Sequence, residues 1–390
     1  MLSVKNPIMT GFFPDPSICR VGNKFYTVHS TFAYFPGVPV FESEDLVHWN
    51  LISNVLDRDS QVPLSGCQHS EGIFAPTIRY HKGTWYMITT NVSDQGNFIV
   101  TAKDPRGPWS EPYYLGESTG GIDPSLFFDD DGTCYYIGQR PRSAGYRYNG
   151  DCEIWIQTLD LDTMQLKPDA TIVLTGFQRK AIWPEGPHLY KKDGYYYILH
   201  AESGTSIHHS VMIARSKNVF GPYEYCPCNP ILTHRHLGAQ YPVTCVGHAD
   251  LVDDGNGNWY MVVLACRPNQ GYTLLGRETF LAKVTWEDGW PVVNAGVGHL
   301  EEVVTLPYEG QPSDDVPQCK TYTFDTPSLP LELLTLRNHR DHELELHAEE
   351  HIVRLFHRCD SLKDCGEPAY LALRQQHWNC EFETSFIPHF

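Results

Sequence analysis

Three acidic residues occupy equivalent positions of a repeated sequence pattern, where carboxylates could act together on one substrate. Asp15 opens the segment DPSICRVGNKFYTVHS, Asp123 opens DPSLFFDDDGTCYYIGQ and Glu185 opens EGPHLYKKDGYYYILHA. One protonated and one ionised carboxyl group is the combination that general acid and general base catalysis requires. Each acid taken alone has a simpler interpretation, because Asp at the entrance of a strand commonly caps a turn. The equivalence of the three positions in the repeat, and not any one acid alone, therefore favours catalysis.

The pattern occurs five times and predicts an all-β fold. Ala75 and His248 open the two further copies, so successive opening residues lie 60, 48, 62 and 63 residues apart. Each copy has an apolar strand, a turn containing Gly and a second strand rich in aromatic residues, which is typical of a β-hairpin. A third strand-like run follows each hairpin: VPVFES, NFIVTAK, EIWIQTL, VMIARSK and TFLAKVT. The pattern predicts a five-bladed β-propeller over residues 1–305.

The innermost strand of each propeller blade lines the central channel, so we expect the five opening residues to converge at one end of it. Glu185 lies in the motif WPEGP, where Trp183, Pro184 and Pro187 form an apolar collar. Burial among apolar groups raises the pKa of a carboxyl group. We therefore expect Glu185 to hold a proton near neutral pH.

The composition excludes several kinds of partner. Lys and Arg together number 29 against 47 Asp and Glu, which gives a formal charge of −18 that would repel nucleic acid. The N-terminal residues MLSVKNPIMT do not resemble a secretory signal, and no apolar window is long enough to span a membrane. We expect a soluble, cytoplasmic protein with no membrane partner, and a homo-oligomer is left open.

Several long motifs, in order along the chain, resemble glycoside hydrolase family 43, in particular its β-xylosidase and α-L-arabinofuranosidase branch. They are NPIMTGFFPDPSICR, EGIFAPTIRYH, GGIDPSLFFDDDG, WPEGPHLY, GHADLV and LGRETFLAKVTWEDGWPVV. The resemblance implies that Asp15 is the general base, that Asp123 orients the acid and tunes its pKa, and that Glu185 is the general acid. It also implies an inverting reaction, in which water attacks without a covalent sugar intermediate.

The same resemblance implies further site residues. Arg277 would reach the sugar hydroxyls, His209 would lie on the substrate side, and Phe32 and Phe74 would form aromatic walls, although relatives more often have Trp at the second position. No cofactor is required. His248 resembles a channel histidine that faces a hydrated calcium ion or a structural water, but a single imidazole is a poor calcium site because calcium prefers six to eight oxygens.

Residues 306–390 lie outside the repeats and are predicted to form a linker and a partial C-terminal β-sandwich. The alternating runs HELELHA, HIVRLFH and CEFETSF read as strands, and the pattern stops at Phe390 in what we expect to be an incomplete sandwich.

The resulting functional prediction is an inverting exo-β-1,4-xylosidase that releases xylose from the non-reducing ends of small xylooligosaccharides, with α-L-arabinofuranosidase activity as an option. The alternatives are a catalytically inactive truncated fragment and a sugar-binding propeller. A sugar-binding protein needs aromatic walls and hydrogen-bonding groups, but it has no use for Glu185 opposite Asp15.

Overall fold

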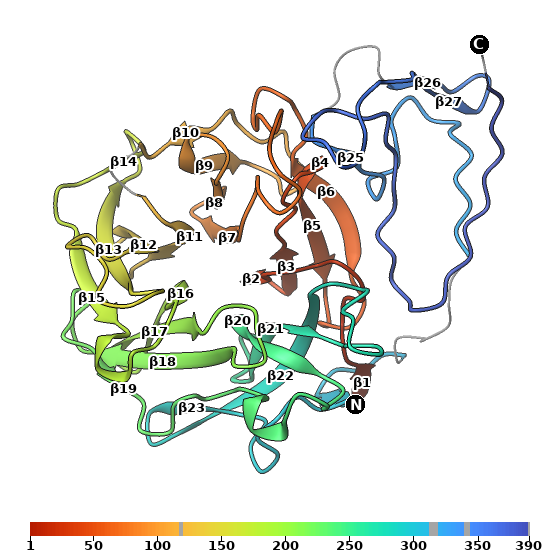
Figure 1. Ribbon diagram of the computed structural model, residues 1–390. Helices are drawn as coiled ribbons and strands as arrows, with labels where there is room; N and C mark the ends of the chain where they lie inside the picture. Colours follow the sequence, from red (N-terminus) through yellow and green to blue (C-terminus); the bar gives the residue numbers. More distant parts are fainter. Residues whose placement is uncertain (117–119, 312–318, 339–343, 389–390) are drawn as a thin grey trace.

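The computed structural model describes residues 1–116, 120–311, 319–338 and 344–388. Five antiparallel sheets are arranged in a ring around a central channel (Figure 1). Two short 3-10 helices, η1 (Phe177–Arg179) and η2 (Arg235–Leu237), are the only helical elements of this part of the chain, and neither could span a bilayer. The predicted all-β class and the five-bladed propeller are confirmed.

Each blade is an antiparallel sheet that starts at the channel and proceeds outward along the chain (Figure 1). Blade 1 contains β2 (Ser17–Val21), β3 (Lys24–Val28), β5 (Gly37–Ser43) and β6 (Asn50–Leu56). Blade 2 contains β7 (Thr77–His81), β8 (Thr84–Asn91), β9 (Gly96–Ala102) and β10 (Tyr113–Tyr114). Blade 3 contains β11 (Ile122–Phe128), β12 (Cys134–Pro141) and β13 (Cys152–Asp160), which pairs with both β14 (Gln165–Leu166) and β15 (Thr171–Thr175).

Blade 4 contains β16 (Glu185–Lys192), β17 (Tyr195–Glu202), β18 (Ser210–Ser216) and β19 (Glu224–Tyr225). Blade 5 contains β20 (Thr244–Asp253), β21 (Trp259–Cys266), β22 (Glu278–Glu287) and β23 (Trp290–Val293). The first strands β2, β7, β11, β16 and β20 contact one another in a closed ring around the channel. Of the predicted opening residues, Glu185 starts β16, Asp123 and His248 lie within β11 and β20, and Asp15 and Ala75 lie two residues before β2 and β7.

The ring is closed by the two ends of the propeller. Strand β1 (Leu2–Lys5) pairs antiparallel with β24 (Val303–Leu306). Next to β1, the side-chain amide of Asn6 donates to the carbonyl of Leu281 over 2.8 Å and accepts from the amide of the same residue over 2.8 Å. These contacts attach the N-terminal segment to blade 5 before the chain enters blade 1.

The core consists of apolar clusters between adjacent blades. Val28 of blade 1 packs with Trp85 of blade 2, and Leu199 of blade 4 packs with Val263 of blade 5, all four being nearly inaccessible. Burial of a large aliphatic or aromatic side chain contributes about 1.5–3 kcal/mol. The inner strands are thus held by packing on the flanks of the blades, which leaves the channel free for polar groups.

The C-terminal region lies beside blade 1 (Figure 1). Strand β25 (Thr335–Leu336) pairs with β4 (Tyr34–Phe35), and β26 (Leu344–His347) forms a hairpin with β27 (Ile352–Leu355). The prediction of a strand at CEFETSF was wrong, because residues 380–386 have no regular structure. Their alternating pattern finds no partner strand within the described residues, and Phe382 and Phe386 are exposed.

Candidate active site

Asp15, Asp123, Glu185 and His248 meet at one end of the channel, at points where the backbone turns sharply. Asp15, Asp123 and His248 have φ angles of 53°, 55° and 52°, and Gly186, which follows Glu185, has a φ of 57°. β-Bulges interrupt the pairing of β11, β16 and β20 at these points. Bulges and left-handed residues redirect a side chain, and such strain is common at functional sites.

Asp15 is buried and held by groups that favour its ionised form. Its Oδ2 accepts a hydrogen bond from Ser30 Oγ over 2.6 Å, and its Oδ1 accepts one from Arg277 Nη1 over 2.8 Å. His248 Nδ1 lies 3.9 Å from the same Oδ1. Burial by itself raises the pKa of Asp15, but Arg277, His248 and Ser30 outweigh it, so that the pKa lies below its usual value. Asp15 is therefore a carboxylate at neutral pH.

The surroundings of Glu185, in contrast, favour its neutral, protonated form. Burial, followed by repulsion from Asp123 and Asp15, raises the pKa of Glu185 well above its usual value, with Arg277 opposing. For Asp123, burial outweighs the attraction of His248 and, with repulsion from Asp15, raises the pKa to about 6. Asp123 Oδ2 also accepts a hydrogen bond from the Gly186 amide over 3.1 Å, which fixes the backbone next to Glu185. The site thus combines a carboxylate with a neutral carboxylic acid, as acid–base catalysis requires.

Replacing Arg277 by alanine is expected to move the acidic limb of the pH profile of kcat/KM to higher pH. Arg277 is the strongest of the groups that lower the pKa of Asp15, so without it the Asp15 carboxylate is protonated at a higher pH. An Arg20→Ala variant is the control, because Arg20 pairs with Asp253, away from the acids. An acidic limb unchanged in Arg277→Ala would show that ionisation of Asp15 does not set it.

Aromatic rings surround the arginine. The Phe32 ring lies 5.2 Å from the ring of Phe74 and 5.8 Å from that of Phe12, and the Arg277 guanidinium lies 4.9 Å above it. A wall of this kind suits the apolar face of a pentose. The structure brings Phe32, Phe74 and Arg277 together, as expected, and it adds Phe12, which the sequence argument missed.

His209 is buried, and one of its ring nitrogens is already hydrogen-bonded within the protein. Its Nδ1 lies 3.0 Å from the carbonyl of Cys245, which can only accept, so Nδ1 carries the proton. Burial lowers the pKa of His209 to about 4, so the ring is neutral. Its Nε2 is a buried acceptor without a partner among the described residues. The ring lies against Gly247, where a Cβ would come within 2.4 Å of it.

The calcium prediction finds little support in the side chains. His248 lies against Gly186 and faces Asp15, whose oxygens are already bound by Arg277 and Ser30. Within the described residues there is no cluster of three His, Cys, Asp or Glu side chains that could hold a metal ion. These residues do not form the oxygen-rich shell that calcium prefers. A calcium ion near His248 stays a prediction, and it would need water for most of its ligands.

Two cavities flank the acids. One, of about 550 Å³, is lined by Glu185, Trp183 and the loop from Tyr146 to Gly150. The other, of about 420 Å³, is lined by Phe12, Phe32 and Arg277 together with Tyr370 and other residues of the C-terminal region. The C-terminal region thus contributes directly to the wall of one cavity.

Several residues of this site were not predicted. Ser30 follows β3, and nothing in its local sequence indicates a hydrogen bond to Asp15. The predicted collar is only partly correct: Pro184 and Pro187 are buried, whereas the Trp183 ring is 40% exposed and lines the larger cavity. Within the motif WPEGP, the buried part of the expected collar is therefore the two prolines.

A propeller whose channel opens on an ionised and a protonated carboxyl group, with an aromatic wall beside them, has the features of a glycoside-cleaving enzyme. Residues 4–291 match the family described as Glycosyl hydrolases family 43, and residues 321–387 match the domain described as Beta xylosidase C-terminal Concanavalin A-like domain. The chain belongs to glycoside hydrolase family 43.

Individual relatives agree with this assignment. A xylosidase/arabinosidase of Butyrivibrio fibrisolvens is 57% identical, over 96% of this chain and 73% of its own length. A non-reducing-end α-L-arabinofuranosidase of Bacteroides ovatus is 41% identical, over 98% of this chain and 71% of its own. The crystal structure of a xylan β-1,4-xylosidase from Bacillus halodurans matches with a TM-score of 0.86 and 39% identity, over 96% of this chain and 72% of that one. The protein is thus similar to both β-xylosidases and arabinofuranosidases.

Proposed function

We propose that this protein is an exo-acting, inverting β-1,4-xylosidase that releases xylose from the non-reducing ends of short xylooligosaccharides. The observation that carries the proposal is the opposite effect of the site on two carboxyl groups, which favours the ionised form of Asp15 and the neutral form of Glu185. In the proposed reaction Asp15 takes a proton from water as the water attacks the anomeric carbon. Glu185 gives its proton to the departing sugar oxygen.

The other residues position these two groups. Arg277 and Ser30 each hold one oxygen of Asp15, so the carboxylate has a fixed orientation toward the attacking water. Asp123 binds the Gly186 amide and repels negative charge on Glu185, which keeps the acid protonated until the leaving oxygen needs it. His209 Nε2 is a buried acceptor without a partner among the described residues, and we assign it to a sugar hydroxyl, while Phe32 is assigned to the apolar face of the sugar.

The cavities support an exo mode of action. The larger cavity contains Glu185, so the leaving sugar, which receives its proton, belongs on that side. On the other side Phe12 and Phe32 line the second cavity together with the C-terminal residues Tyr370 and Arg374, and we assign the terminal sugar to this cavity. A cavity walled by the C-terminal region favours the terminal sugar of a short chain.

The same pocket is proposed to accept α-L-arabinofuranosides. Relatives that bear the name of each activity resemble this chain over nearly its whole length. Xylopyranose and arabinofuranose place their hydroxyls similarly enough for one set of hydrogen-bonding residues to serve both.

Hydrolysis of a nitrophenyl β-D-xyloside and a nitrophenyl α-L-arabinofuranoside by the same preparation tests the proposal. We expect both to be cleaved, with the higher kcat/KM on the xyloside. Asp15→Asn, which keeps the size of the side chain and removes its charge, is the control for a contaminating hydrolase. Cleavage of the arabinofuranoside alone, or of neither substrate, would contradict the proposed xylosidase.

A further inference from the structure

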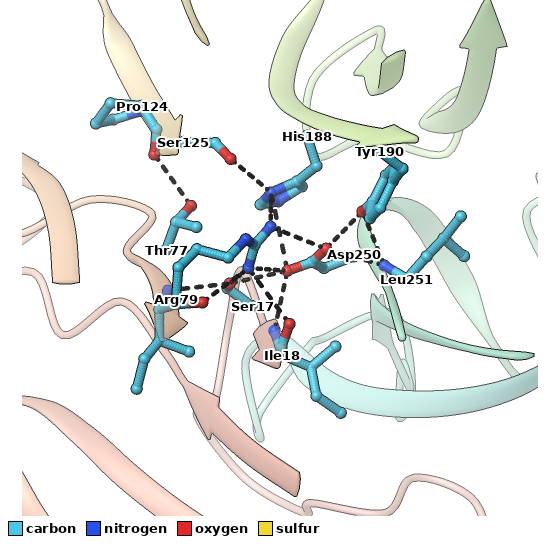
Figure 2. A network of polar contacts seen from close by, with 11 residues as sticks. Ser17, Ile18, Thr77, Arg79, Pro124, Ser125, His188, Tyr190, Asp250 and Leu251 are labelled. Carbon is cyan, nitrogen blue, oxygen red and sulfur yellow. Dashed lines mark hydrogen bonds and ion pairs between the residues drawn. The ribbon is translucent and has the colours of Figure 1, made fainter. Parts of the chain in front are cut away.

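A buried network of polar side chains crosses the channel next to the acids and joins the inner strands of all five blades (Figure 2). Its centre is an ion pair between Arg79 of β7 and Asp250 of β20, with nitrogen–oxygen distances of 3.0 and 3.3 Å. Ser17 of β2, Ser125 of β11 and His188 of β16 complete it.

The side chain of Asp250 is inaccessible to solvent, and its negative charge is compensated by Arg79 and by several hydrogen bonds. It accepts hydrogen bonds from Ser17 Oγ over 2.8 Å, from the amides of Ile18 and Leu251 over 3.0 and 2.9 Å, and from the hydroxyl of Tyr190 (Figure 2). Burial raises the pKa of Asp250, but Arg79, His188 and Tyr190 outweigh it and bring the pKa to about 2. A buried charge with this many partners has one favourable geometry, because any displacement leaves an unsatisfied group.

His188 connects the centre of the network to blades 3 and 4. Arg79 Nη2 lies 3.1 Å from His188 Nδ1, and an arginine can only donate, so Nδ1 is an acceptor. Ser125 Oγ, at 3.2 Å from the same nitrogen, must therefore donate its hydroxyl proton. Near this point Thr77 of β7 donates to the carbonyl of Pro124 over 3.0 Å, which joins blade 2 to the residue after Asp123.

The spacing along the strands relates the network to the acids. Ser17 is two residues after Asp15, Ser125 is two after Asp123, and His188 is three after Glu185, across the bulge of β16. Three of the inner strands, β2, β11 and β16, thus place a network residue two or three residues after an acid at the mouth of the channel, while β7 and β20 contribute Arg79 and Asp250.

We propose that this network, centred on Arg79 and Asp250, is the positioning device of the reaction: it fixes the inner strands relative to one another and thereby the separation of Asp15 from Glu185. Arg79, Asp250, Ser17, Ser125 and His188 are positioning residues that touch no substrate. The inference rests on the proposed roles of the acids, since it is their separation that the network holds. An inverting reaction depends on that separation, because a water molecule must fit between the base and the sugar.

The matched variants Ser17→Ala and Ser125→Ala test the proposal, since both remove one hydroxyl from a buried serine. Ser17 holds the strand of the base, so its variant is expected to lose rate about equally on xylobiose and on nitrophenyl xyloside. Ser125 holds the strands of Asp123 and Glu185, so its variant is expected to lose more rate on xylobiose, whose leaving oxygen needs a proton. The expected losses in kcat are roughly tenfold to 10²-fold, as for a misplacement of up to about 1 Å.

Ser53→Ala is the control. Ser53 is also buried, but it lies on β6, the outer strand of blade 1, and its hydroxyl donates to the carbonyl of Pro105. All variants are assayed well below their melting temperatures, which are measured in parallel. Arg79→Lys serves as a second variant: it keeps the charge, loses the forked contact to Asp250 and His188, and is expected to lower kcat with little change in KM.

Variants that melt earlier but keep the wild-type kcat on both substrates would overturn the proposal and make the network purely structural. Equal losses on both substrates for Ser17→Ala and Ser125→Ala would also overturn it. Failure of the proposed function would be recognised separately, because the wild-type protein would then cleave neither xylobiose nor nitrophenyl xyloside. If the wild type cleaves only arabinofuranosides, the comparison is made between arabinofuranosides with good and poor leaving groups.

Discussion

Replacing Glu185 by alanine is expected to slow hydrolysis of xylobiose by roughly 10²- to 10⁴-fold while affecting a nitrophenyl xyloside far less. The departing sugar of xylobiose is a poor leaving group and needs the proton that Glu185 holds. Nitrophenolate is a stable anion that leaves without one. Comparing kcat/KM of the variant and of the wild-type protein on the two substrates measures the difference.

The basic limb of the pH profile of kcat/KM is a second measurement that reports on Glu185. The acid is active only while protonated, so activity falls as the pH rises through the raised pKa of Glu185. In Glu185→Ala this limb should disappear on the nitrophenyl substrate. Equal losses on both substrates, with the basic limb retained, would assign the acid to another residue, and Asp123 would be the first candidate.

Replacing Asp15 by alanine is expected to reduce hydrolysis of both substrates to a similar extent, by roughly 10²- to 10⁴-fold. Water must be activated whatever group leaves, so the quality of the leaving group does not compensate for the missing base. Because Arg277 and Ser30 bind Asp15 directly, Asp15→Asn is the more conservative variant and should show the same pattern.

The comparison of the two alanine variants is decisive for the roles of these residues. If Asp15→Ala, and not Glu185→Ala, loses more rate on xylobiose than on the nitrophenyl xyloside, the base and the acid are exchanged. Substantial activity of Asp15→Ala on both substrates would show that another group activates the water.

The acids could be predicted from the sequence because the fold is repetitive. Residues at the start of equivalent strands must meet at one end of a propeller channel, so the positions of Asp15, Asp123 and Glu185 followed from the repeat alone. The direction of the shift in the pKa of Glu185 was also predicted, from burial, and the structure adds repulsion from Asp123 and Asp15. Their division into base, orienting residue and acid came from the family resemblance and from the chemistry of inversion.

Contacts between blades could not be predicted in the same way. Arg79 and Asp250 are 171 residues apart, and Ser30 approaches Asp15 only because β3 returns the chain to the channel mouth. Arg79, Ser125 and Asp250 occur in ordinary strand sequences, where an isolated polar residue indicates an exposed face as readily as a channel. Only the closed ring of inner strands brings these side chains together.

The C-terminal region shows the limit of patterns based on alternation. The run CEFETSF has the alternation of a strand, but a strand also requires a neighbour with free backbone groups, which residues 380–386 do not find. Conversely, Tyr370 and Arg374 lie in a segment without regular structure, and they line a cavity next to Arg277. Their position depends on docking of the C-terminal region against blade 1. No feature of the local sequence predicts that docking.

The stereochemistry of the first product tests the central claim most directly. Proton NMR of xyloside hydrolysis, recorded before mutarotation equilibrates the anomers, distinguishes direct attack by water from a covalent intermediate. The proposed role of Asp15 as the base that activates water, with Glu185 as the acid, predicts that α-xylose appears first. Initial release of β-xylose would mean retention and would contradict the role of Asp15 as the base that activates water.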